Sequence, residues 1–254
     1  RRQRQMCIRD RAKHIHVYDG HLPDTETADI VLVGIQESRG SDDPDSAQGA
    51  ADLIRKHLYR MHYWHEEVTI ADIGNIRPGA GIQDSYAAIK MVVTELMSMG
   101  KTVVLLGGSH DITLAQYGAY RDLEIIVEAT CIDARIDLRG ESHLRTDNFL
   151  LEMLTGEPSL VKHYNHIGFQ SYFVHPRLLE TMDRLRFDCY RVGVVKENIE
   201  DMEPVLRSTN LLSIDINAIK NSEAPANTET PNGLTGEEAC QPVSYTHLRA
   251  HETR

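Results

Sequence analysis

The sequence predicts an α/β protein in which a mostly parallel sheet is covered by helices on both faces, a three-layer α/β/α arrangement. Short apolar runs alternate along the chain with segments that repeat apolar residues at helical spacing. Alternation of this kind produces right-handed crossovers between parallel strands. Polar residues directly follow several of the apolar runs, at the edge of a parallel sheet where functional side chains collect.

The individual elements follow from these patterns. Apolar runs bounded by turn residues predict strands at residues 29–35, 68–73, 102–106, 125–132, 166–170, 188–194 and 211–215. Apolar residues three and four positions apart predict helices at residues 50–59, 82–99, 111–120, 147–154 and 176–185. There is no internal repeat and no low-complexity linker, so we predict one domain over residues 12–241.

The two ends of the chain are related at the level of codons. Residues 6–10 can be encoded as ATG TGT ATA AGA GAC, whose reverse complement encodes residues 243–247. An inverted repeat of this kind has no protein-chemical reason, and it resembles read-through of a sequencing adapter. We therefore set residues 1–11 and 242–254 aside and expect an internal fragment, truncated at both ends. The alternative, a basic arm and a histidine-containing tail, requires the codon agreement to be chance.

The charge and cysteine content exclude several classes of partner. The net charge is −11, and it becomes about −16 without the arginine-rich ends, which argues against nucleic acid and anionic membranes. No apolar run approaches the roughly 20 residues of a transmembrane helix. Cys131 and Cys189 lie in strand-like runs, and the chain has no Cys-x-x-Cys pair. This pattern predicts a reduced, cytoplasmic protein.

Three short polar segments follow predicted strands. They are Gly-Gly-Ser-His-Asp at 107–111, Asp-Ala-Arg-Ile-Asp at 133–137 and Ser-Ile-Asp-Ile-Asn at 213–217. Because side chains in extended chain alternate, residues 133, 135 and 137 should share one face, as should residues 215 and 217. The carboxyl ends of parallel strands point at one crevice, so we predict that these segments converge there.

The predicted cluster holds one imidazole and three carboxylates. Its members are His110, Asp133, Asp137 and Asp215. Three like charges held close together are costly unless a cation or a proton neutralises them. Mixed histidine and carboxylate ligands with open positions suit manganese better than calcium or structural zinc. The sequence therefore predicts a manganese site.

These motifs together resemble the ureohydrolase family of arginase, agmatinase and formimidoylglutamase. That family carries Gly-Gly-Asp-His-Ser, Asp-Ala-His-x-Asp and Ser-x-Asp-x-Asp in the same order, and these motifs hold two manganese ions. The Asp-Ile-Gly at 72–74, the strand segment at 167–170 and the Gly-Leu-Thr-x-x-Glu at 233–238 are also similar to the family pattern. The resemblance implies an arginase-like fold, a small amidine or guanidine substrate, and homo-oligomers such as trimers or hexamers.

The chain departs from the family pattern at three places. Arg135 stands where the family has histidine, Asn217 stands where it has aspartate, and Ser109 and Asp111 are exchanged. Arginine cannot ligate a metal, and asparagine offers one neutral oxygen. The resemblance therefore implies all the protein ligands of one manganese ion and loss of the second site. A charge count suggests that Arg135 occupies the electrostatic place of the second ion.

The predicted activity is hydrolysis of a linear, non-peptide C–N bond in a formimino or guanidino substrate, by a water whose pKa the metal lowers. Formimidoylglutamase is the first choice, because Arg135, Arg139 or Arg145 would help to hold a carboxylate-rich tail. The predicted catalytic residues are Arg135 and Asn217, and the predicted substrate-binding residues are His143, Arg145, Asn148 and Glu238. One alternative is a catalytically silent member that binds a ligand or a subunit. The other is a metal-free ion-pair network.

Each motif also has a simpler interpretation when taken alone. Residues 107–111 would be a strand-to-helix turn with a capping serine or aspartate, residues 133–137 an ion-pair ladder, and residues 215–217 a turn. Glu238 would be a helix-start carboxylate after Thr235. His166 and the remaining histidines would be surface or packing residues. The order of the motifs, each after a buried strand, favours the metal site.

Overall fold

A computed structural model describes residues 15–62 and 67–241. The terminal segments that we interpret as adapter read-through, 1–11 and 242–254, lie outside the described residues. The chain divides into two compact units: the first runs to Leu123 and includes Leu144–Thr146, and the second contains Glu124–His143 and the chain from Asp147. The single domain over residues 12–241 stays a prediction.

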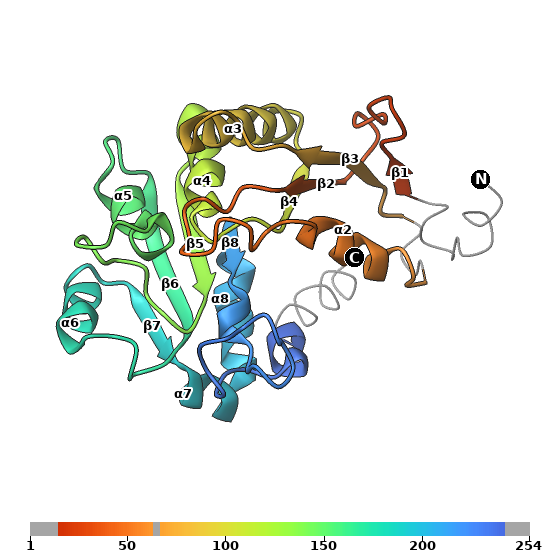
Figure 1. Ribbon diagram of the computed structural model, residues 1–254. Coiled ribbons are helices and arrows are strands. Elements are labelled where there is room, and N and C mark those ends of the chain that lie inside the picture. The colour runs from red at the N-terminus through yellow and green to blue at the C-terminus, as the bar shows by residue number, and fades with distance from the viewer. Residues whose placement is uncertain (1–14, 63–66, 242–254) are drawn as a thin grey trace. The chain divides into compact units, whose positions relative to one another are not determined.

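The first unit is built on a parallel four-stranded sheet in the order β1-β3-β2-β4 (Figure 1). Its elements are β1 (Ile15–Val17), β2 (Ile30–Ile35), α2 (Ala50–Leu58), β3 (Ile70–Ile76), α3 (Ile82–Ser98), β4 (Thr102–Leu106) and α4 (Ile112–Asp122). Strand β2 pairs with β3 on one side and β4 on the other, and its residues from Val31 onward are buried. This explains why β2 is a continuous apolar run rather than an alternating one.

Helix α3 shows how local sequence positions the helical layer of this unit. It begins after Gly81, whose backbone N–H donates to the Asp84 carboxylate at 2.7 Å. A carboxylate in the first turn satisfies a free backbone donor and is stabilised by the helix dipole. Ile89, Val93 and Leu96 then recur at helical spacing and are buried in the core with the sheet and α4.

The second unit contains another parallel four-stranded sheet, in the order β7-β6-β5-β8. Its elements are β5 (Val127–Ile132), α5 (Phe149–Thr155), β6 (Val161–Phe169), α6 (Pro176–Arg184), β7 (Asp188–Arg191), α7 (Val192–Glu197), α8 (Met202–Ser208) and β8 (Leu211–Ile214). Short 3₁₀ turns lie in this unit at Ile199–Asp201 and Ile216–Ala218, and the 3₁₀ turn at Arg145–Asp147 contains residues of both units. The core joins Ile132, Ile167 and Leu234 to side chains of α7 and α8.

Parallel sheets flanked by helices confirm the predicted α/β class. The predicted strand at 188–194 is wrong in its second half, because β7 ends at Arg191 and α7 begins at Val192. The run of valines there has strand propensity, but Val195 is buried in the core as part of a helix. Strand β1 and helix α8 were not predicted. No helix among the described residues has the length and apolar character needed to cross a membrane.

Candidate metal centre

Two of the predicted metal ligands leave neighbouring strands of the second unit at the same edge. Strands β5 and β8 pair in parallel with Ile132 opposite Ile214, so Asp133 and Asp215 both follow directly after this pair. The backbone N–H of Asp215 donates to the Ile132 carbonyl at 3.0 Å, which extends the pairing to the start of the polar segment. The sheet register therefore places these two aspartates at adjacent strand ends, and the meeting of their side chains at one point stays a prediction.

Both strands end in a turn made by the aspartate itself. The Asp133 carboxylate accepts the Arg135 backbone N–H at 3.3 Å, and the Asp215 carboxylate accepts the Asn217 backbone N–H at 2.7 Å. An aspartate that accepts the N–H two residues later bends the chain. We predicted that alternating residues share a face because we took both segments to be extended strands. That premise is wrong, since neither residues 133–137 nor residues 215–217 form a strand.

The three aspartates differ in exposure. Asp133 and Asp137 are 3% and 7% exposed, while Asp215 is half-buried. The Asp137 carbonyl accepts the backbone N–H of Leu150 at 3.2 Å, which ties this part of the segment to the start of α5. Burial of Asp133 and Asp137 penalises their charged form unless a cation or a hydrogen-bond donor compensates it.

Arg135 has different partners from those predicted. Its Nη2 lies 2.5 Å from Glu229 Oε2, and its guanidinium carbon lies 4.6 Å from the centre of the Phe173 ring. Within the described residues the guanidinium pairs with Glu229 rather than with any of the three aspartates. The charge count from the sequence must therefore be corrected, because it did not include Glu229, whose carboxylate offsets the charge of Arg135.

His166 supports the backbone of the same segment. It is completely buried, its Nε2 lies 3.0 Å from the Asp133 carbonyl, and its Nδ1 lies 3.0 Å from the Tyr164 hydroxyl. The carbonyl only accepts, so Nε2 donates to it and Nδ1 accepts from Tyr164. Burial raises the pKa of Tyr164 well above its usual value, and Cys131 and Asp137 add to the shift, so the hydroxyl keeps its proton. His166 is thus a packing residue with a specific structural role.

His110 belongs to the first unit, in the loop between β4 and α4. Gly107 and Gly108 have φ of 81° and 85°, which favour glycine, and a Cβ on Gly107 would lie 3.1 Å from the Ile35 carbonyl oxygen. The Ser109 N–H donates to the Glu37 carbonyl at 3.1 Å. The chain therefore makes a tight turn against the end of β2 and presents His110 just before the helix.

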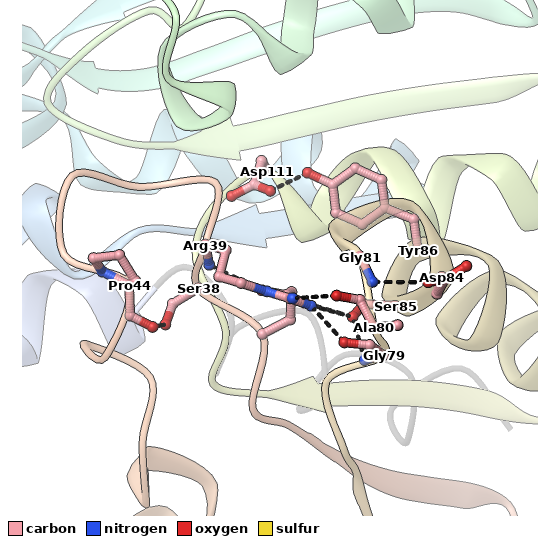
Figure 2. A network of polar contacts seen from close by, with 11 residues as sticks. Ser38, Arg39, Pro44, Gly79, Ala80, Gly81, Asp84, Ser85, Tyr86 and Asp111 are labelled. Atoms are coloured by element: carbon pink, nitrogen blue, oxygen red, sulfur yellow. Dashed lines mark hydrogen bonds and ion pairs between the residues drawn. The ribbon is translucent and has the colours of Figure 1, made fainter.

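Asp111 is held by Tyr86 rather than by a helix cap. It occupies the N-cap position of α4 but its side chain makes no cap hydrogen bond, contrary to the simpler interpretation of this motif. Instead the Tyr86 hydroxyl from α3 donates to the fully buried Asp111 carboxylate (Figure 2). Arg145, a predicted substrate-binding residue, lies with its guanidinium carbon 5.7 Å from the centre of the Tyr86 ring. Arg145 thus packs near the loop that carries His110.

A second network anchors the loop after β2 in the first unit. Arg39 donates from Nε to the Glu37 carboxylate at 2.9 Å, and its Nη atoms donate to the carbonyls of Gly79 and Ala80 at 3.0 and 3.1 Å (Figure 2). Ser85 also donates to Glu37. Burial raises the pKa of Glu37, but the hydrogen bonds from Arg39 and Ser85 outweigh it and lower the pKa to about 2. The carboxylate is therefore a fixed anion.

The remaining predicted substrate-binding residues have individual positions. His143 is exposed, and Asn148 uses its side-chain amide to donate to the Ser142 carbonyl at 2.9 Å. Glu238 accepts the Thr235 backbone N–H at 2.8 Å, and the Glu238 N–H donates to the Thr235 hydroxyl at 3.0 Å. This reciprocal pair is a capping box at the start of the helical residues 236–241, which agrees with the simpler interpretation of Glu238. Its contact with a substrate stays a prediction.

His110 and the three aspartates belong to different units. Their convergence around one ion therefore stays a prediction. Within the second unit, Asp133 and Asp215 are brought to adjacent strand ends. Within the first unit, His110 is placed on a tight turn beside Asp111.

The strand-end motifs, in their order along the chain, match a known family. The model of the Arginase family matches residues 28–249. The chain belongs to the arginase family. This confirms the resemblance on which the sequence interpretation depended.

Solved structures show the same fold at low sequence identity. The arginase-family chain has a TM-score of 0.78 and 20% identity to the formimidoylglutamase from Bacillus subtilis, covering 94% of this chain and 79% of that one. It has a TM-score of 0.75 and 17% identity to Trypanosoma cruzi formiminoglutamase with Mn²⁺, covering 85% and 80%. It has a TM-score of 0.70 and 23% identity to the agmatine ureohydrolase of Thermoplasma volcanium, covering 87% of this chain and 78% of that one.

Three residues that contact the polar motifs of this arginase-family chain were missed in the sequence. They are Tyr86, Phe173 and Glu229, which contact Asp111 and Arg135. Glu229 lies in a loop with no periodic pattern, so spacing offers no signal for it. Tyr86 lies on the buried side of α3, where the sequence pattern predicts an aromatic residue of the hydrophobic core. A hydroxyl at a buried position is the one available signal, because it needs a partner.

Proposed function

We propose that this protein hydrolyses a linear, non-peptide C–N bond of an amidine or guanidine with the help of a manganese ion. The observation that carries the proposal is the delivery of Asp133 and Asp215 to adjacent strand ends by the pairing of β5 and β8. Membership of the arginase family supports it. Solved relatives with the same fold include a formimidoylglutamase and an agmatine ureohydrolase.

The chemistry of the donor set fits manganese. Asp133, Asp137, Asp215 and His110 would hold one ion, since carboxylate and imidazole ligands suit it. The nearest cation in the segment, Arg135, is paired with Glu229, so it does not neutralise the buried carboxylates. When bound, the ion would supply a water of lowered pKa as the nucleophile. Arg135 and Asn217 replace the ligands of a second ion, so one equivalent is expected.

The protein itself contributes orientation. The turn N–H groups of Arg135 and Asn217 each occupy one oxygen of Asp133 and Asp215, which fixes the rotation of both carboxylates. The buried His166 fixes the backbone of Asp133 from behind. Ligands held by such surrounding hydrogen bonds need little reorganisation when an ion binds.

Formiminoglutamate is our first choice of substrate. Its carboxylates would be attracted to Arg139 and Arg145, which lie within the connection between β5 and α5. Arg139 is half exposed and lies 4.0 Å from Asp147, a weak ion pair that leaves its charge available. Glu238, His143 and Asn148 are proposed as further substrate contacts from that loop and from the Gly-Leu-Thr segment.

Metal content and turnover test the proposal together. Purified protein loaded with manganese and then desalted should retain about one equivalent by elemental analysis. Asp215→Asn should lower metal retention and turnover of formiminoglutamate, agmatine or arginine by about 10-fold or more. Asp183→Asn on α6 removes an exposed carboxylate of the same unit and should change neither. Retention of two ions would contradict the proposal of a single metal site. Absence of turnover for each of the three substrates would contradict the proposed hydrolase activity.

One observation favours a second candidate, a catalytically silent member that binds a ligand or a subunit. Arg135 is fixed by an ion pair and an aromatic ring, as a structural residue would be. The double change Arg135→His with Asn217→Asp should then bind a second ion and create or raise activity. If the native protein already hydrolyses formiminoglutamate and the double change abolishes turnover, the silent candidate is excluded.

Self-association and location accompany the proposal. By family resemblance we propose a trimer or hexamer, and from the cysteine pattern we propose a location in the cytoplasm. Sedimentation velocity at micromolar concentration should show a mass of three or six chains. A monomer at that concentration would contradict the proposed assembly without affecting the proposed chemistry.

A further inference from the structure

A pocket of about 430 Å³ lies in the second unit, beyond the ends of β6 and β7. Its walls come from the residues that follow β6, from the β7–α7 junction and from the segment before Leu234. The residues that matter for the argument are Gln170, Tyr172, Arg191, Lys196, Lys220 and Asn232. Crevices at this edge of a parallel sheet are common ligand sites.

The pocket has three cationic side chains and no acidic one in its lining. Lys196 lies 3.3 Å from Glu238 and Lys220 lies 2.8 Å from Glu223, so each has a carboxylate outside the lining. Arg191 is exposed, and within residues 15–62 and 67–241 its guanidinium makes no hydrogen bond or ion pair. The pocket therefore carries an excess positive charge that is concentrated at Arg191.

The neutral part of the lining is held by hydrogen bonds among its own residues. Gln170 is 1% exposed, its amide nitrogen donates to the Asn232 carbonyl at 3.0 Å, and its amide oxygen accepts from Thr230 at 3.0 Å and from the Tyr172 hydroxyl. Every polar atom of the Gln170 side chain is thus in use. A wall of this kind keeps its shape when a ligand enters, which reduces the ordering cost of binding.

The Arg191 guanidinium packs over Gly193, in the first turn of α7. A Cβ built on this residue would lie 3.4 Å from Arg191 Nη2 and 3.8 Å from its Nε, which is ordinary van der Waals contact. The guanidinium therefore lies over the start of α7, at the pocket lining.

We propose that this pocket binds a small oxyanion, a carboxylate or a phosphate group, with Arg191 as the main contact. A guanidinium binds both groups through two parallel hydrogen bonds, and the two lysines add attraction from the sides. The site is separate from the carboxylate cluster of Asp133 and Asp215 in its chemistry, because it attracts anions and the cluster attracts a cation. It requires neither a metal nor C–N hydrolysis, so it goes beyond the proposed function.

Isothermal titration calorimetry on the full chain, after its metal has been removed with a chelator and the chelator has been removed by desalting, tests the proposal using glutarate and inorganic phosphate as separate probes. We expect binding of at least one probe with a Kd of about 1 mM or tighter, weakened by added sodium chloride. Binding of glutarate alone identifies a carboxylate site, and binding of phosphate alone identifies a phosphate site.

The variants decide whether the pocket is responsible. Arg191→Gln should weaken binding about tenfold, and Lys220→Gln should weaken it less. Arg207→Gln removes an arginine from the ion pair with Glu203 on α8 and should leave binding unchanged. Circular dichroism checks that each variant is folded. No binding of either probe to the parent chain, or equal weakening by Arg191→Gln and Arg207→Gln, would overturn the proposal.

Discussion

The Asp-Ile-Gly motif at 72–74 should be a structural anchor, and Asp72→Asn tests this. Asp72 is 1% exposed and accepts Arg55 Nε at 2.7 Å and Nη2 at 2.8 Å. It also accepts the Gly74 N–H at 3.0 Å and the Tyr59 hydroxyl. Burial and the contact with Asp72 raise the pKa of Tyr59, so its hydroxyl remains a donor. One carboxylate thus joins β3 to α2.

The magnitude follows from the burial of both partners. Arg55 is 8% exposed, so replacing the Asp72 carboxylate by an amide leaves a buried guanidinium without its main counter-charge. Breaking a buried ion pair from one side costs about 3–5 kcal/mol, which increases local opening by at least two orders of magnitude. Asp52 also accepts from Arg55, at 3.1 Å, but its side chain is 63% exposed. Asp52→Asn should therefore cost less than about 1 kcal/mol.

Two measurements check the difference. Urea denaturation followed by circular dichroism should show a much lower midpoint for Asp72→Asn than for Asp52→Asn. Hydrogen exchange should locate the loss at the amides of β3, which pair with β1 and β2. Equal losses for the two variants would refute the reasoning, because burial would then not determine the cost of removing a charge next to Arg55.

Other changes test single contacts in the same way. The pKa of Glu37 is lowered from 4.5 to about 2, so the stability from its pairing with Arg39 is present above pH 4.5 and is lost as the pH falls toward 2. The free energy of unfolding, measured during acid titration, should fall by about 3 kcal/mol over this range. Glu37→Gln should abolish this pH dependence. Tyr86→Phe removes the hydroxyl donor of the buried Asp111 and should lower the free energy of unfolding by about 1–3 kcal/mol in urea, with no change if water replaces the hydroxyl fully. Gly233→Ala places a Cβ 2.6 Å from a backbone nitrogen and should cost about 1–3 kcal/mol by thermal denaturation; an unchanged Tm would show that this segment can move.

The close approach of two backbones at Gly233 explains why the Gly-Leu-Thr segment begins with a glycine. Leu234 forms a parallel bridge with Ile219, and its N–H donates to the Ala218 carbonyl at 2.8 Å. The segment is therefore an extension of the region after β8, which also contains Asp215. A backbone that approaches another backbone this closely has no space for a side chain.

The sequence by itself determined the parallel α/β class, most element positions and the placement of Asp133 and Asp215 after buried strands. These features are readable because burial on both faces of a parallel strand requires a continuous apolar run, which is a local property of the chain. The extent of β6 shows the limit. Its first residues, from Val161, include the exposed Lys162 and the half-buried His163, so the apolar pattern begins only later.

Only the tertiary structure decided which groups the polar side chains contact. The partner of Arg135 is Glu229, the partner of Asp111 is Tyr86, and Arg191 lines the pocket of the second unit. The valine-rich chain after β7 likewise forms the helix α7, because the helical conformation buries Val195 in the core of the second unit. Residue spacing encodes which face of an element is apolar, but ion pairs and turns depend on loops that meet only after the chain has folded.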